Sequence, residues 1–170
     1  MIRLLLVSFA MSVSFAVHSE GLGIDEFAEI EARAGIPQRV LYSLALTESG
    51  RRGRPWPWTM NYAGKSYYFA DRDTLHRAME LLIGRGKTNF DVGVMQIHWR
   101  FHSHLFDSTW EATDPTINAQ AGARILIDRF NEYRNWAKAI AAYHSKTEHL
   151  GRGYLANFAK NYISTKKEKM

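Results

Sequence analysis

The hydrophobic pattern of the chain is mostly helical. Apolar residues recur three or four positions apart in successive segments, and glycines or capping residues separate these segments. Pro37 is suited to the first turn of the second segment, and Asp114 followed by Pro115 is a typical helix start. The pattern predicts helices over residues 25–34, 37–48, 73–83, 92–102, 114–130, 135–145 and 151–164.

One stretch breaks the helical pattern and predicts strands. Residues 58–62 and 66–69 are rich in aromatic residues, and Ala63-Gly64-Lys65 between them is a short glycine-containing turn. This arrangement is typical of a β-hairpin. With 170 residues, we expect one mainly α domain of α+β type, with about six or seven helices and a small β-hairpin.

The first nineteen residues have the layout of an export signal. A single Arg3 precedes an apolar stretch over residues 4–13, and small residues follow it. This stretch is short for a membrane-spanning helix, so we expect a cleavable signal peptide over residues 1–19, with an uncleaved anchor as the alternative. Cleavage is expected after Ala16 or Ser19. The domain would then cover residues 20–165, followed by a basic tail over residues 166–170.

Composition narrows the class of partner. The chain has no cysteine, which excludes thiol chemistry and means that an exported domain must fold on its core alone. Its formal net charge of +5 favours a polyanionic surface such as an acidic cell wall or anionic lipid, and nucleic acid is disfavoured for an exported protein. Aromatic residues make up 13% of the chain, which indicates either stacking surfaces for ring-shaped ligands or a large aromatic core.

Glu48 is the first candidate for chemistry. It lies on the last turn of an apolar predicted helix, directly before Ser49 and Gly50. A carboxylate near a helix C-terminus is mildly unfavourable, and burial raises the pKa of a carboxyl group. Such a glutamate can act as a general acid near neutral pH. From these residues alone, a solvated helix-end glutamate is an equally good interpretation.

The segment around Gly93 and Gln96 offers an amide donor and acceptor beside a flexible position, although a glycine bend before a core helix would look the same. His98, His102 and His104 lie close together, but no glutamate accompanies them in the zinc-protease arrangement. No nucleophilic serine motif or phosphate-binding glycine loop is present. We therefore expect no metal and no cofactor.

Four motifs together are similar to a known family. The stretches TESG, GVMQIHW, DPTINAQAGARIL and AIAAYHS occur in this order. In this order they resemble the lytic transglycosylases of the soluble-lytic-transglycosylase (SLT) type, whose lysozyme-like domain is related to goose-type lysozyme. The resemblance covers about residues 24–162. It implies an enzyme that cleaves the β-1,4 bond between N-acetylmuramic acid and N-acetylglucosamine in peptidoglycan, with formation of 1,6-anhydro ends.

The resemblance also implies residue roles. Glu48 matches the family's catalytic acid and base, and Ser49 its helper. Met95 and Gln96 match the segment that lines the cleft, with Gln96 as the expected sugar contact. Tyr143 matches the tyrosine that approaches the catalytic carboxyl group and the N-acetyl group of the substrate.

Three features depart from the family pattern. His144 replaces an asparagine, which leaves its contribution to substrate binding open. Asp114-Pro115 stands in place of Asn-Pro, which should preserve the helix cap. The longer gap between the first two motifs contains the aromatic hairpin, of which five residues are either sugar platforms or hairpin core. They are Trp56, Trp58, Tyr62, Tyr67 and Tyr68.

Two alternatives stay open at this level. The same fold could hydrolyse the bond as a muramidase, with Asp91 as a second carboxylate that positions water, or it could bind peptidoglycan without turnover. Small exported enzymes of this type resemble those that serve secretion, pilus or conjugation machines. We therefore expect a periplasmic monomer that acts on glycan strands, with such an apparatus as the candidate partner.

Overall fold

The structure of the protein, a computed structural model, describes residues 22–167. The predicted signal peptide over residues 1–19 and the last three residues of the predicted basic tail lie outside the described residues. Within residues 22–167, no helix is both long enough and apolar enough to span a membrane.

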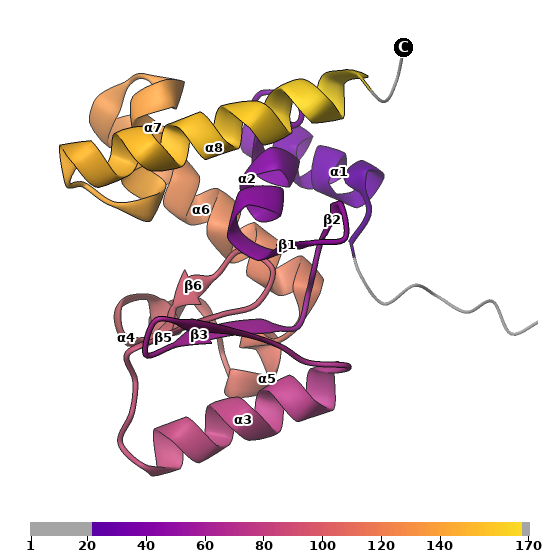
Figure 1. Ribbon diagram of the computed structural model, residues 1–170, viewed down its shortest axis with the longest axis vertical. Coiled ribbons are helices and arrows are strands. Elements are labelled where there is room, and N and C mark those ends of the chain that lie inside the picture. The colour runs from indigo at the N-terminus through magenta and orange to yellow at the C-terminus, as the bar shows by residue number, and fades with distance from the viewer. Residues whose placement is uncertain (1–21, 168–170) are drawn as a thin grey trace, which may run out of the picture.

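The described chain has a helical part and a smaller mixed part, and the long helix α6 (Pro115–Tyr133) runs from one to the other (Figure 1). The helical part contains α1 (Ile24–Ala34), α2 (Val40–Ser49), α7 (Trp136–His144) and α8 (Glu148–Lys167). The mixed part contains α3 (Arg72–Gly84), α4 (Trp99–His102), a 3-10 turn (Ser103–Leu105), α5 (Thr109–Ala112) and a four-stranded antiparallel sheet. The strands of this sheet are β3 (Thr59–Tyr62), β4 (Lys65–Tyr68), β5 (Phe90–Val92) and β6 (Ile97–His98), in the order β4-β3-β5-β6. A separate ribbon pairs β1 (Gly50–Arg51) with β2 (Arg54–Pro55).

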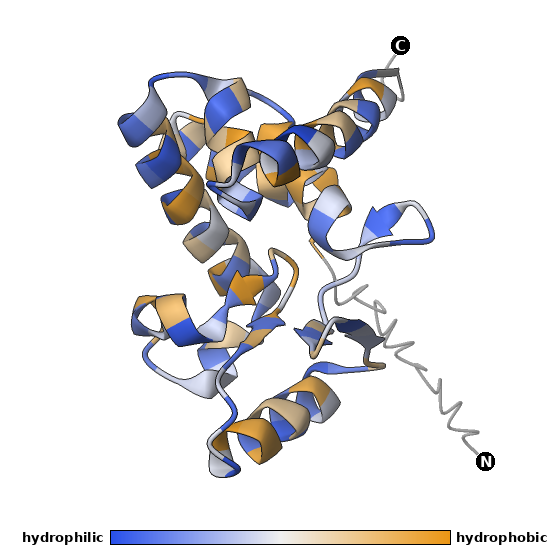
Figure 2. Cartoon of the chain, turned by 60° about the vertical axis from the view of Figure 1, so that its left-hand side comes forward, coloured by the Kyte–Doolittle hydropathy of each residue, from blue (hydrophilic) through white to orange (hydrophobic). Residues whose placement is uncertain are grey.

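The mainly α class is confirmed. The described part has eight α-helices, more than the expected six or seven because α4 and α5 are single turns. Most helices alternate polar and apolar segments, as expected for elements that bury one face (Figure 2). By contrast, α2 is apolar on all sides, and its residues from Val40 to Ala45 are buried, so it is the central helix of the helical part.

The start of α2 differs from the prediction. The helix begins at Val40 rather than near Pro37, because its cap comes from another helix. The buried carboxylate of Glu31 on α1 accepts the backbone N–H groups of Arg39 and Leu41, both at 2.7 Å, and of Tyr42 at 3.2 Å. These are the otherwise unsatisfied donors of a helix N-terminus, and a carboxylate there also suits the helix dipole.

The predicted β-hairpin is confirmed as β3 and β4. Its turn residues Ala63 and Gly64 have positive φ angles of 52° and 75°, the conformation of the tight turns that match strand twist. The sheet register separates two faces, because side chains alternate along strands. One face carries the buried Met60, Val92 and Ile97, and the other carries a polar row. The row consists of Ser66, Asn61, Asp91 and His98, one residue from each strand.

The predicted helix over residues 92–102 is wrong for most of its length. The chain forms β5, a turn over residues 93–96 and β6, and only α4 at its end is helical. Gly93 and Gln96 have positive φ angles of 82° and 47°, a conformation that a right-handed helix cannot contain. Gly93 is required for a second reason, because a β-carbon there would overlap the side-chain amide of Asn118.

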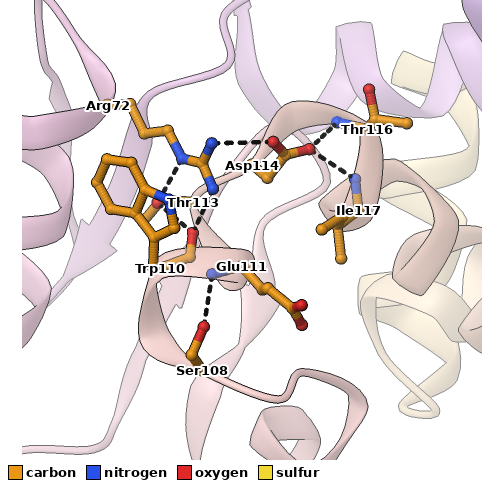
Figure 3. Close-up of polar contacts among 8 residues, drawn as sticks. All are labelled: Arg72, Ser108, Trp110, Glu111, Thr113, Asp114, Thr116 and Ile117. Atoms are coloured by element: carbon orange, nitrogen blue, oxygen red, sulfur yellow. Dashed lines mark hydrogen bonds and ion pairs between the residues drawn. The ribbon is translucent and has the colours of Figure 1, made fainter.

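Arg72 at the start of α3 fastens this helix to the junction of α5 and α6 (Figure 3). Its guanidinium donates to Thr113 Oγ1, Asp114 Oδ2 and the Trp110 carbonyl, at 3.2, 3.0 and 2.8 Å, and lies 4.1 Å from the centre of the Trp110 ring. Asp114 meanwhile caps α6, where its Oδ1 accepts the N–H groups of Thr116 and Ile117. The predicted start of this long helix is thus confirmed.

Asn118 on α6 joins three further segments. Its side chain is fully buried, accepts the N–H of Met95 at 2.9 Å, and donates to the carbonyls of Val92 at 3.1 Å and Ala112 at 2.9 Å. Every hydrogen-bonding direction of the amide but one is thereby used on backbone groups. This one side chain fixes the 93–96 turn against α6 and the end of α5.

We expect Asn118→Ala to lower the free energy of unfolding by about 3 kcal/mol, because it leaves buried backbone groups without partners. Chemical denaturation followed by circular dichroism measures this change. Asn131→Ala, at an exposed position of the same helix, is the matched control and should change stability by less than about 0.5 kcal/mol. Equal losses in the two variants would contradict the role assigned to Asn118.

Candidate active site

A cleft of about 460 Å³ lies between the polar face of the sheet and the helical part. Its lining comes from α2, the sheet, the 93–96 turn, α4, α6 and α7. Five of the eight site residues predicted from sequence line this cleft together: Glu48, Asp91, Gln96, Tyr143 and His144. The other three, Ser49, Met95 and Tyr68, are not part of the lining.

Glu48 lies half-buried on the last turn of α2. Burial is the main cause that raises its pKa to about 8, and the nearby negative charge of Asp91 adds to this effect. The hydroxyl of Tyr154 donates to Glu48 Oε1 at 2.5 Å and acts in the opposite direction, because it stabilises the ionised form. At neutral pH Glu48 is therefore mostly protonated. When it loses its proton, the hydrogen bond from Tyr154 stabilises the carboxylate that forms.

Tyr154 on α8 is a site residue that sequence reasoning missed. Its buried ring stacks parallel to the ring of His144 at 4.7 Å between centroids. This contact gives a structural role to His144, the residue that departs from the family pattern: it orients the tyrosine that binds Glu48. In the sequence Tyr154 is indistinguishable from its apolar neighbours on the last helix, and no local signal connects it with Glu48.

Tyr143 on α7 has a different role from Tyr154. Its hydroxyl donates to the carbonyl of Met95 at 2.9 Å and so holds the 93–96 turn against α7. Burial, and then the charges of Glu48 and Asp91, raise the pKa of Tyr143 well above its usual range. The hydroxyl group therefore stays protonated. Tyr143 lines the cleft, but the hydroxyl bonded to Glu48 belongs to Tyr154.

Ser49 and Met95 support the cleft from behind. Ser49 is fully buried, and its Oγ lies 3.0 Å from the carbonyl of Ala45 and 2.7 Å from that of Val94. Its hydroxyl group thus links the end of α2 to the 93–96 turn. Met95 is also fully buried and packs so closely on Gly122 of α6 that a β-carbon there would collide with it. Both residues position the turn rather than face a ligand.

Gln96 lines the cleft at the end of the same turn. Its Nε2 donates to the carbonyls of Gly93 at 2.8 Å and Thr59 at 3.2 Å. These two bonds fix the direction of the amide group. A substrate can therefore use only its carbonyl oxygen, as an acceptor.

Asp91 and His98 form a pair on the polar row of the sheet. His98 Nδ1 donates to Asp91 Oδ1 at 2.7 Å, across the β5–β6 register. Phe101 lies 4.8 Å from the ring of His98, lines the same cleft and is 64% exposed. An exposed aromatic ring in a polar cleft is a suitable platform for a sugar face. Phe101 is a second site residue that sequence reasoning missed.

The aromatic hairpin residues divide into packing and exposed residues. Trp58 is buried, and the indole N–H of Trp56 donates to the carbonyl of Phe69 at 2.9 Å. Tyr68, predicted as a substrate contact, is 41% exposed on β4, where the guanidinium of Arg51 covers its ring at 5.0 Å. The two tryptophans and Tyr62 thus pack against the core, whereas Tyr67 and Tyr68 are exposed.

Within residues 22–167, no three His, Asp or Glu side chains are grouped so as to hold a metal ion. Asp91 engages one ring nitrogen of His98. The rings of His102 and His104 lie 6.2 Å apart and tilted.

Comparison with known proteins identifies the family. The family model described as the transglycosylase SLT domain matches residues 25–165, which is most of the chain. No curated protein and no solved structure gives a significant match. Members of the matched family are enzymes, lyases that cleave peptidoglycan and act outside the cytoplasm. The chain belongs to the transglycosylase SLT domain family and is a peptidoglycan lytic transglycosylase.

Proposed function

We propose that the protein cleaves the β-1,4 bond between N-acetylmuramic acid and N-acetylglucosamine, leaves 1,6-anhydro ends, and uses Glu48 first as acid and then as base. The observation that carries this proposal is the half-buried Glu48 in the lining of a cleft, where burial raises its pKa to about 8. A carboxyl group in this state can donate a proton at neutral pH.

In the first step, Glu48 protonates the glycosidic oxygen as the bond from this oxygen to the anomeric carbon breaks. The carbonyl oxygen of the substrate's own N-acetyl group bonds to this carbon as the glycosidic bond breaks, and the positive charge is shared over the ring that forms. In the second step, the ionised Glu48 takes the proton of the C6 hydroxyl group, whose oxygen bonds to the anomeric carbon and displaces the N-acetyl oxygen. Glu48 ends protonated, as it began.

Tyr154 acts on the state of Glu48 between the two steps. Its hydrogen bond at 2.5 Å stabilises the carboxylate that exists between them. Burial and the charge of Asp91 stabilise the acid that is needed first. The opposing influences keep Glu48 within reach of both protonation states.

Side chains on both sides of the cleft supply substrate contacts in this proposal. The polar sheet row offers Asn61, Ser66 and His98 for hydrogen bonds with sugar hydroxyl and amide groups, and Gln96 offers its carbonyl oxygen. Phe101 supplies the stacking surface.

Hydrolysis by Glu48 and Asp91 is the second candidate. Asp91 lines the same cleft and influences the pKa of Glu48, as a second carboxylate would. Product analysis separates the two, since hydrolysis leaves reducing ends.

For the cellular setting, we propose export through the signal-like residues 1–19 and action as a periplasmic monomer. An enzyme of this family suits the local opening of the wall for a secretion, pilus or conjugation machine. The sequence pattern of the N-terminus supports the export.

We expect Glu48→Gln to lower the rate of muropeptide release from purified sacculi by about a thousandfold or more, because the acid and base are lost together. Mass spectrometry of wild-type products should find 1,6-anhydro ends. The variant should keep its circular dichroism spectrum and its binding to sacculi. A fully active variant would falsify the assignment of Glu48, and reducing ends from the wild type would favour hydrolysis.

The pH profile provides a further prediction. Since the first step needs protonated Glu48, kcat/KM should fall as the pH rises through about 8. Asp91→Asn removes a like charge and should move this alkaline limb to lower pH. Tyr154→Phe removes a hydrogen bond to the ionised form and should move it to higher pH. If the alkaline limb shifts in the same direction in both variants, or does not shift in either, then Glu48 does not control the profile.

A further inference from the structure

Basic side chains gather in the lining of the active-site cleft. His98 and His102 come from β6 and α4, Arg129 from α6, and Lys146 from the loop after α7. We call Arg129 and Lys146 the basic cluster. Of the carboxyl groups in the same lining, Glu48 is bonded to Tyr154 and Asp91 to His98. The ion-pair partner of Arg129 and Lys146 is Glu132 instead.

Glu132 neutralises only part of this charge. Its Oε1 accepts from Lys146 Nζ at 2.8 Å and its Oε2 from Arg129 at 3.2 Å. The bond from Lys146 is the main cause that holds the pKa of Glu132 below its usual range, so this carboxylate is ionised. One negative charge between two cations leaves one positive charge in excess.

Arg129 has unused hydrogen-bonding capacity. Its Nε is buried and has no partner in the part of the chain that the structure describes. Its side chain as a whole is only partly exposed, at 25%. Buried donors of charged groups are normally paired, so an arginine in this state is suited to a ligand with acceptor oxygens.

The surroundings of His102 indicate the same deficit of negative charge. Burial is the main cause that lowers the pKa of His102, and the basic side chains of His104, Arg129 and His98 add to this effect. The carboxylate of Asp128 acts in the opposite direction but does not reverse the shift. Mutually repelling basic groups in a concave surface are stabilised when an anion binds among them.

We propose that the basic cluster binds carboxylate groups of the peptidoglycan strand, so that the enzyme prefers glycan whose carboxylates are free over glycan whose carboxylates are neutralised. This inference rests on the proposed function, because it needs the strand to lie in the same cleft as Glu48. The anionic groups that accompany the cleaved bond are carboxylates, on the stem or, after its removal, on the lactyl group. The planar guanidinium of Arg129 matches a carboxylate in shape and charge.

The test compares three forms of purified sacculi: intact, with carboxylates converted to neutral amides, and with stems removed by an amidase so that lactyl carboxylates remain. The variant is Arg129→Gln with Lys146→Gln. Arg124→Gln with Lys160→Gln is the matched control, since it removes two exposed charges from α6 and α8 outside the cleft. The charge-conserving double variant Arg129→Lys with Lys146→Arg shows whether changes at these positions disturb folding. It should keep part of the preference for intact over amidated sacculi.

On intact sacculi, the rate of muropeptide release at low substrate should fall about tenfold in the variant and little in the control. The wild-type rate should be lower on amidated than on intact sacculi by a similar factor. The rate of the variant should be the same on both. A full wild-type rate on sacculi without stems would show that the lactyl carboxylate is sufficient. A reduced rate would show that the stem carboxylates are the groups that bind. Equal losses in the variant on intact and amidated sacculi, or an equal loss in the control, would overturn the proposal.

Equilibrium binding separates this proposal from the proposed function. In the Glu48→Gln background, co-sedimentation with intact and amidated sacculi measures recognition without turnover. Preference for intact sacculi that disappears in the cluster variant supports carboxylate recognition even if the reaction type is wrong. Competition by heparin as effective as that by soluble muropeptides of equal charge would instead indicate unspecific attraction of polyanions, and would overturn it.

Discussion

The buried amide of Asn118 is the constraint on which the cleft depends. It bonds to backbone groups of β5, the 93–96 turn and α5 at once, and its close approach requires a glycine at position 93. The turn that it fixes carries Met95, whose carbonyl accepts from Tyr143, and Gln96, which faces the cleft. A shift of this amide would therefore move the cleft wall relative to α6 and α7, which also carry Arg129 and His144.

The electrostatic state of Glu48 depends in turn on contacts with distant parts of the chain. Helix α2 is buried and brings Glu48 to the cleft, while α8 packs against α2 and brings Tyr154. Polar contacts hold the two helices in register, among them the bond from Asn161 to Thr47 at 3.0 Å and the contact between Ser43 and Thr165 at 3.2 Å. The pKa of a surface glutamate at a helix end would lie near its ordinary value, so the raised pKa of Glu48 follows from this packing.

The sequence was informative where local chemistry decides the structure. Asp114-Pro115 specified the start of α6, and Ala63-Gly64 specified the turn of the hairpin. It failed where a distant residue decides. Helix α2 starts at Val40 because Glu31 caps it, and residues 92–98 form strands and a turn because Asn118 holds them.

The candidate site divides in the same way. The motifs located Glu48, Gln96 and Tyr143 in one cleft because the three motifs that carry them belong to one family resemblance, which implies a shared cleft. Tyr154 could not be found in this manner, because it lies outside the four motifs, 106 positions from Glu48. The same holds for the exposed Phe101, which belonged to a segment predicted as a core helix.

Two glutamates on adjacent helices illustrate how surroundings, not residue type, assign a role. Burial raises the pKa of both Glu31 and Glu48. Around Glu31, three backbone N–H groups oppose this effect, as expected for a carboxylate that caps a helix. Around Glu48, a single tyrosine hydroxyl opposes it and the negative charge of Asp91 reinforces it. The first carboxyl group is committed to structure by its donors, whereas the second is left with one donor and an open cleft, which is the condition for exchanging a proton with a substrate.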